Sequence, residues 1–161
     1  MTHLPSVPST QSRTWSIAAF AADAADDSPR ALMIAPPRVA TVGIWNSGLF
    51  EDARNAAIYA GIHGSVIIVT GGESDIAYAN GKRDFEVMPA RIPVFYGVHP
   101  SVGHGGTYNQ DNGGPFGVVA VAWLKWQLQG DTSAAGRGYF VGNDCGICKD
   151  AGWQIDARAL P

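Results

Sequence analysis

From residue 39 onward, apolar runs alternate with stretches whose apolar residues follow a helical period. The runs are rich in β-branched residues and each ends in polar or glycine residues, which predicts three buried strands: Val39–Trp45, Val66–Val69 and Ile92–Val98. Steps of three and four residues predict a helix after each strand: Phe50–Ala60, about Asn80–Met88, and Phe116–Leu128 with Gly130 as its C-cap. This alternation predicts an α/β fold with a parallel sheet of three βα units.

The first 37 residues lack this regularity. They are rich in Ser, Thr, Pro and Ala, and Pro29, Pro36 and Pro37 interrupt the chain. Only Ile17–Ala25 has the composition of a short helix. We therefore expect an irregular or replaced N-terminal arm over residues 1–37 and a partial α/β domain over residues 38–161.

The overall composition narrows the function classes. The 161 residues are 46% hydrophobic with a net charge of −3, which is typical of a packed domain and gives no basic surface for nucleic acid. No apolar run approaches the ~20 residues of a membrane-spanning helix. The first residues lack the basic start of a secretory signal, so we expect no signal peptide in this chain, and the compartment stays open.

Two polar loops follow the second and third predicted strands. The first contains Asp75, and the second contains His104 between Gly103 and Gly105. The carboxyl ends of parallel strands lie at one edge of a sheet, so a carboxylate and an imidazole placed there can meet. The carboxylate would then fix the imidazole tautomer and stabilise its protonated form. Taken singly, Asp75 could instead be a turn or N-cap residue, and His104 a loop residue bonded to backbone.

These loops carry a family resemblance. The motifs Gly-Gly-x-x-Asp-x-x-Tyr-x-Asn (71–80) and Gly-His-Gly-Gly-Thr-Tyr (103–108), with the helix after them, are similar to the acid and histidine segments of α/β hydrolases. The nearest group is that of the dienelactone hydrolase-like and cutinase-like polyester esterases, over roughly residues 39–153. The resemblance implies a serine esterase for small-molecule or polymeric carboxylic esters, without a cofactor, from a group whose members are often secreted.

The resemblance also implies roles for individual residues. Asp75 would be the acid of a catalytic triad and His104 its general base. Trp45 would follow the strand before the acid strand, where these enzymes often line the substrate cleft. Tyr78 and Tyr108 are further candidates for an apolar cleft, although aromatic residues near a sheet end more often pack than bind.

The nucleophile of that family is not recognisable. It is a serine in a Gly-x-Ser-x-Gly turn between a strand and a helix, ahead of the acid. Ser74 and Ser101 each have only one of the two glycines, and Ser28 has none and a proline beside it. Only three of about eight family strands are visible, so we expect a truncated or mis-spliced product. An open sheet edge would then favour self-association and poor solubility. The alternative is a catalytically inactive relic or a binding protein.

The two cysteines form a short Cys145-Gly-Ile-Cys148 motif. Four ligands are usual for zinc and no second pair exists, while a redox dithiol would open a helix after a strand. We expect a local disulfide or two structural thiols, and no metal. A metal site built from His99 and His104 is a more remote interpretation.

Overall fold

The computed structural model describes residues 18–20, 39–49, 59 and 61–161. Within these ranges the chain forms one five-stranded sheet in the order β1-β2-β3-β4-β5. The strands are β1 (Ala18–Phe20), β2 (Thr41–Trp45), β3 (Ser65–Gly71), β4 (Val94–His99) and β5 (Gln154–Arg158). Strands β1 to β4 are parallel, and β5 pairs antiparallel with β4. The sheet is therefore mixed.

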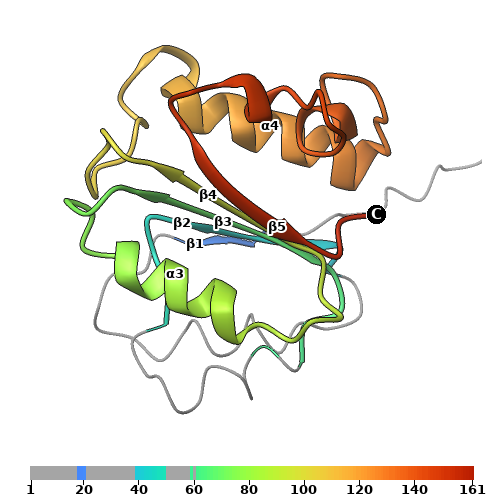
Figure 1. The fold of residues 1–161 in the computed structure, drawn as a ribbon, viewed down its shortest axis with the longest axis horizontal. Helices are drawn as coiled ribbons and strands as arrows, with labels where there is room; N and C mark the ends of the chain where they lie inside the picture. The colour runs from blue at the N-terminus through green and yellow to red at the C-terminus, as the bar shows by residue number, and fades with distance from the viewer. Residues whose placement is uncertain (1–17, 21–38, 50–58, 60) are drawn as a thin grey trace, which may run out of the picture.

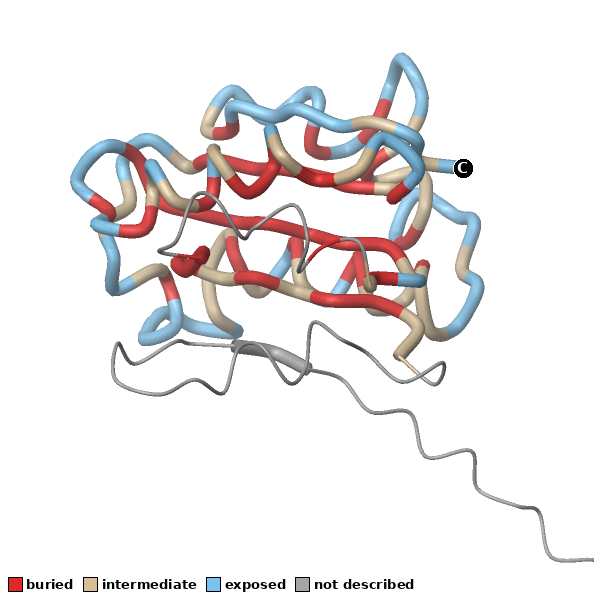
Figure 2. Tube along the Cα trace, turned by 90° about the horizontal axis from the view of Figure 1, so that it is seen from below, coloured by how far each residue is buried: buried red, intermediate tan, exposed pale blue. Residues whose placement is uncertain are grey.

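Two helices cover opposite faces of this sheet (Figure 1). Helix α3 (Tyr78–Val87) connects β3 to β4, and α4 (Gly114–Gln129) follows β4. Three short 3-10 helices complete the described elements: η1 (Asp111–Gly113), η2 (Arg137–Tyr139) and η3 (Ile147–Lys149). The central strands are buried along most of their length because both faces are covered (Figure 2). This explains why β3 has no polar alternation in its sequence.

Most of the predicted elements are confirmed. Strands β2, β3 and β4 and helices α3 and α4 lie within a few residues of the expected bounds. Gly130 ends α4 in the left-handed conformation, with φ 69°, as a C-cap glycine should. The helix expected over Phe50–Ala60 lies outside the described residues except for Tyr59.

The structure differs from the sequence-based expectations at both ends of the sheet. Residues 17–25 have the composition of a short helix within an arm expected to be irregular, but Ala18–Phe20 form β1 and pair in parallel with β2. Pairing with a neighbouring strand outweighs the weak local preference of so short a segment. The sheet is also not purely parallel as expected, because its last strand, β5, pairs antiparallel with β4. The other residues of the N-terminal arm lie outside the described part of the chain, and self-association through an open edge stays a prediction.

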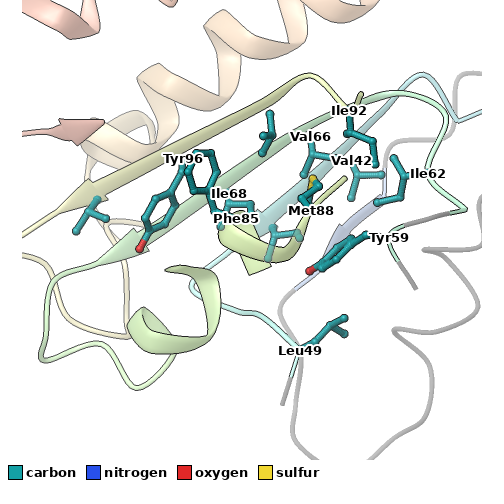
Figure 3. Packing of buried hydrophobic residues seen from close by; sticks show 13 residues of the cluster. Val42, Leu49, Tyr59, Ile62, Val66, Ile68, Phe85, Met88, Ile92 and Tyr96 are labelled. Carbon is teal, nitrogen blue, oxygen red and sulfur yellow. The ribbon is translucent and has the colours of Figure 1, made fainter. Parts of the chain in front are cut away.

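The sheet separates two apolar clusters. On the α3 face, side chains such as Val66, Ile68 and Tyr96 pack against Phe85 and Met88 (Figure 3). On the α4 face the cluster is rich in aromatic rings: Phe95, Phe116, Trp123, Trp126, Phe140 and Trp153. Each helix thus buries one side of β3 and β4, which fixes the loops at the ends of these strands. No helix in the described ranges is long and apolar enough to cross a membrane.

Candidate active site

The loops after β2, β3 and β4 meet at one edge of the sheet. In the parallel register Trp45 lies beside Val69, and Gly71 lies beside His99. The loop after β2 begins with Asn46, whose backbone N–H donates to the carbonyl of Val69 at 2.8 Å. Polar residues that are far apart in the sequence are therefore neighbours at this edge, as parallel strands require.

Two glycines allow the loops after β3 and β4 to touch backbone to backbone. A Cβ atom added at Gly71 would lie 2.1 Å from the carbonyl oxygen of Val102, and one at Gly72 would lie 2.3 Å from that of Pro100. The Gly72 N–H donates to the Val102 carbonyl at 2.9 Å across the same gap. Any larger residue would force the loops apart, so the glycine pair sets the distance between the acid and histidine loops.

Asp75 and His104 form a hydrogen-bonded pair between these loops. The Nδ1 atom of His104 lies 2.8 Å from Oδ1 of Asp75. The carboxylate side chain is fully buried, whereas 46% of the imidazole side chain is exposed. A carboxylate only accepts hydrogen bonds when ionised, so the bond places the proton of a neutral imidazole on Nδ1 and leaves Nε2 as the acceptor. The two residues predicted from the strand ends are thus brought together.

The buried carboxylate of Asp75 has several donors besides His104. Its Oδ1 accepts the backbone N–H of Ala77 at 2.9 Å, and its Oδ2 accepts that of Gly71 at 2.8 Å and the amide of Asn46 at 2.7 Å. Burial alone would raise the pKa of Asp75, but the hydrogen bonds outweigh it and the pKa of this carboxyl is lowered. Asp75 is therefore held as a carboxylate.

Tyr108 extends this network. Its hydroxyl donates to Oδ1 of Asn46 at 2.6 Å, and its ring meets Phe116 edge to face at 6.1 Å. Burial, with a contribution from the negative charge of Asp75, raises the pKa of Tyr108 to about 12. The phenol is therefore a hydrogen-bond donor at neutral pH. Asn46 is the residue that sequence reasoning missed; its signal is an Asn directly after an apolar strand, here with φ 44°.

The three aromatic residues expected in a cleft lie in different surroundings. Trp45 is half-buried on the α4 face, where its ring lies 6.3 Å from that of Phe116. Tyr78 packs against the α3-face cluster and lines a cleft of roughly 230 Å³ beside α3 and β5. Tyr78 donates its backbone N–H to the Asp75 carbonyl at 2.9 Å, but only Tyr108 of the three joins the network of the Asp75 carboxylate through its side chain. Their role in binding a substrate stays a prediction.

Neither of the two described candidate nucleophiles, Ser74 and Ser101, is hydrogen-bonded to His104. Ser74 is exposed in the acid loop, the hydroxyl of Ser101 is paired with Nδ1 of His99 at 3.1 Å, and Ser28 lies outside the described residues. Within the described part of the chain, Nε2 of His104 has no hydrogen-bond partner. Asp75 and His104 are therefore paired, and no nucleophile is assigned among the described residues.

The two cysteines are bonded to each other. Cys145 and Cys148 form a disulfide with Cα atoms 5.1 Å apart, and Cys145 is buried in the α4-face cluster. Among the described residues, no three His, Cys, Asp or Glu side chains are placed to hold a metal ion. His99 and His104 are each engaged through Nδ1 with another side chain.

Comparison with known proteins adds no family assignment. No protein-family model matches the chain, and no curated protein matches it. The α/β architecture and the geometry at the carboxyl ends of β2, β3 and β4 are therefore the structural observations from which a function can be proposed.

Proposed function

We propose that this chain carries the acid–base part of a serine-type carboxylic-ester hydrolase of the α/β-hydrolase class. His104 acts as the general base and Asp75 orients it. The observation that carries the proposal is the 2.8 Å hydrogen bond between a fully buried carboxylate and a half-exposed imidazole, at the carboxyl ends of parallel strands. The resemblance of both loops to the acid and histidine segments of that family supports the same assignment.

The chemistry follows from the tautomer. Nε2 of His104 accepts the proton of the attacking hydroxyl as its oxygen bonds to the ester carbonyl carbon, and the imidazolium that forms is stabilised by Asp75. The imidazolium then gives that proton to the alcohol oxygen of the ester as the bond between this oxygen and the carbonyl carbon breaks. The alcohol departs and an acyl-enzyme remains. In the second half, His104 accepts a proton from water as the water attacks the acyl carbon. It then gives that proton to the enzyme oxygen as its bond to the acyl carbon breaks, which restores the hydroxyl and releases the carboxylic acid.

One observation favours a second candidate, a binding protein that retains the pair without ester hydrolysis. In the described part of the chain no hydroxyl group is hydrogen-bonded to His104. Such a protein would be folded, would keep the Asp75–His104 bond and would form no acyl-enzyme. The two candidates differ in one measurable property, which is covalent capture of a hydroxyl by an acylating or phosphonylating probe.

A fluorophosphonate probe tests the proposal. We expect the folded chain to be labelled on one serine, identified by peptide mass spectrometry, and to hydrolyse p-nitrophenyl esters. His104→Ala should slow both reactions by roughly 10²–10⁴-fold, the usual contribution of a general base. His63→Ala, which removes an exposed loop histidine, is the matched control and should leave both rates unchanged.

The opposite result is equally clear. Folded protein, checked by circular dichroism, that takes up no probe would overturn the hydrolase proposal and favour the binding protein. Equal labelling of wild type and His104→Ala would show that His104 is not the base.

A further inference from the structure

The Asp75–His104 pair belongs to a longer chain of hydrogen bonds that crosses all three loops. Tyr108 donates to Asn46 at 2.6 Å, Asn46 donates to Asp75 at 2.7 Å, and Asp75 accepts His104 at 2.8 Å. Asn46 follows β2, Asp75 follows β3, and His104 and Tyr108 both follow β4. This series of hydrogen bonds begins and ends in the loop after β4 and passes through the loops after β2 and β3.

We propose that Asn46 is a positioning residue, locked by the Tyr108 hydroxyl, that holds the Asp75 carboxylate in the orientation that His104 needs. This inference rests on the proposed function and adds Asn46, which neither the acid–base pair nor the family resemblance assigns. It also gives Tyr108 a role that differs from lining a substrate cleft, because its hydroxyl is directed at Asn46.

The chemistry of the side chains decides which group donates and which accepts in each of these hydrogen bonds. An ionised carboxylate has no proton to give, so the side of the Asn46 amide that faces Asp75 must be the NH₂ group. The amide oxygen then faces Tyr108 and requires a donor, which the phenol supplies. A flipped amide would set its oxygen against the carboxylate. Tyr108 therefore fixes the orientation of Asn46, and Asn46 in turn fixes that of Asp75.

The backbone of Asn46 is held as firmly as its side chain. Its N–H donates to Val69 on the neighbouring strand, and only 6% of the residue is exposed. Its φ of 44° lies in the left-handed region, which Asn tolerates better than most residues. Its amide nitrogen also lies 3.5 Å from the carbonyl of Gly103, the residue before His104. Asn46 thus contacts the acid and the loop that carries the base.

Loss of Asn46 would leave the carboxylate unevenly held. The oxygen Oδ1 would keep both Ala77 and His104 as donors, whereas Oδ2 would keep only the Gly71 N–H. A buried carboxylate that loses a donor lowers its free energy by turning toward another donor or by admitting water. Either change would tilt the imidazole, and a displacement of about 1 Å can slow a reaction about 10²-fold.

The test uses Asn46→Gly, because glycine accepts the left-handed backbone without strain and removes the whole amide. The low-field NMR resonance of the His104 Nδ1–H proton, identified by its absence in His104→Gln, reports the bond to Asp75 without any need for turnover. We expect this resonance to shift or disappear in Asn46→Gly. The kcat for p-nitrophenyl esters should fall about 10- to 100-fold with KM within about twofold.

Tyr108→Phe is the second variant and decides the question if Asn46→Gly does not fold. It removes only the hydroxyl and keeps the ring contact with Phe116. The same resonance should shift by a smaller amount, and kcat should fall by less than in Asn46→Gly. Asn112→Gly is the matched control, because Asn112 is exposed and also left-handed, with φ 56°, but lies outside the network.

The two proposals fail in different ways. An unchanged resonance in both folded variants would overturn the positioning role, whether or not the protein hydrolyses esters. Equal changes in Asn46→Gly and Asn112→Gly would also overturn it, because they would show a general effect of the substitution. Absence of hydrolysis in wild type, with the resonance lost only in the network variants, would remove the proposed function and leave the geometric role of Asn46 in place.

Discussion

The face of the sheet under α4 and the face under α3 are held by different chemistry. Under α4, Trp123 is only 1% exposed and lies edge to face with Trp126 and Phe140, at ring distances of 5.4 and 5.3 Å. Its indole N–H is also satisfied, since it donates to the hydroxyl of Thr41 at 2.8 Å. This face depends mainly on the burial of large rings.

Under α3 the apolar cluster is mostly aliphatic and is supplemented by buried polar contacts. Asp84 is fully buried and accepts the backbone N–H of Leu49 at 2.7 Å. Arg158 of β5 donates to the carbonyls of Phe85 and Met88 near the end of α3, and its guanidinium lies 4.6 Å from the centre of the Phe85 ring. Specific hydrogen bonds therefore fix α3 and its neighbouring segments, in addition to hydrophobic contact.

The difference matters because each member of the acid–base pair is anchored to a different helix. Asp75 accepts the N–H of Ala77, at the start of α3. His104 lies in the loop that leads to α4, where the Thr107 hydroxyl donates to the Gly113 carbonyl at 2.5 Å and accepts the Phe116 N–H at 3.1 Å. The Asp75–His104 bond is thus a junction between the two faces, and changes on either face should reach it.

The largest expected effect is on the aromatic face. Trp123→Ala should lower the free energy of unfolding by about 3–5 kcal/mol, because it leaves a cavity among packed rings. Urea denaturation followed by circular dichroism measures this. Val118→Ala, at a site 52% exposed on the same helix, should change it by less than about 0.5 kcal/mol. A loss below about 1 kcal/mol for Trp123→Ala would mean that the rings contribute little.

A smaller effect is expected on the α3 face. Asp84→Ala removes the acceptor of a buried N–H and should cost about 1–3 kcal/mol in the same assay. Glu86→Ala, two residues along α3, removes an exposed carboxylate paired with Lys82 and should cost no more than about 1 kcal/mol. If Asp84→Ala proved more damaging than Trp123→Ala, the ranking of the two faces would be reversed.

The smallest expected effect concerns the junction and depends on pH. The pKa of Asp75 is lower in the folded than in the unfolded chain. Its ionised form therefore stabilises the fold fully above the unfolded pKa of about 3.9, and this contribution is lost as the pH falls through the folded pKa. The stability difference between wild type and Asp75→Asn should be larger at pH 6 than at pH 3, as measured by urea denaturation. A difference that is constant or grows toward pH 3 would contradict this.

The sequence predicted the parts of the fold that rest on long apolar patterns. The β-branched run of β3 and the helical period of α4 each identify one type of element over their whole length. Strand β5 was not predicted, because Gln154–Arg158 is mostly exposed and only its pairing with β4 makes it a strand. Strand β1 has three residues, too few for any period to appear.

In the candidate site, too, some residues could be predicted from the sequence and one could not. Asp75 and His104 could be predicted because each follows a recognisable strand and the loops have a distinctive residue order. The bridging role of Asn46 could not, because it depends on a contact between residues 29 positions apart and on another 62 positions apart. Such contacts follow from strand order and loop shape, which single-residue patterns do not encode.

The backbone contact between the loops after β3 and β4 has a consequence for engineering and for natural variation. At Gly71 and Gly72 a single added methyl group would collide with the neighbouring loop, so one mutation there alters two loops at once. The exposed positions Glu73 and Ser74 in the same loop face no such constraint. A library intended to change what this edge of the sheet binds should diversify these exposed positions and keep both glycines, because the glycines preserve the spacing on which the acid–base pair depends.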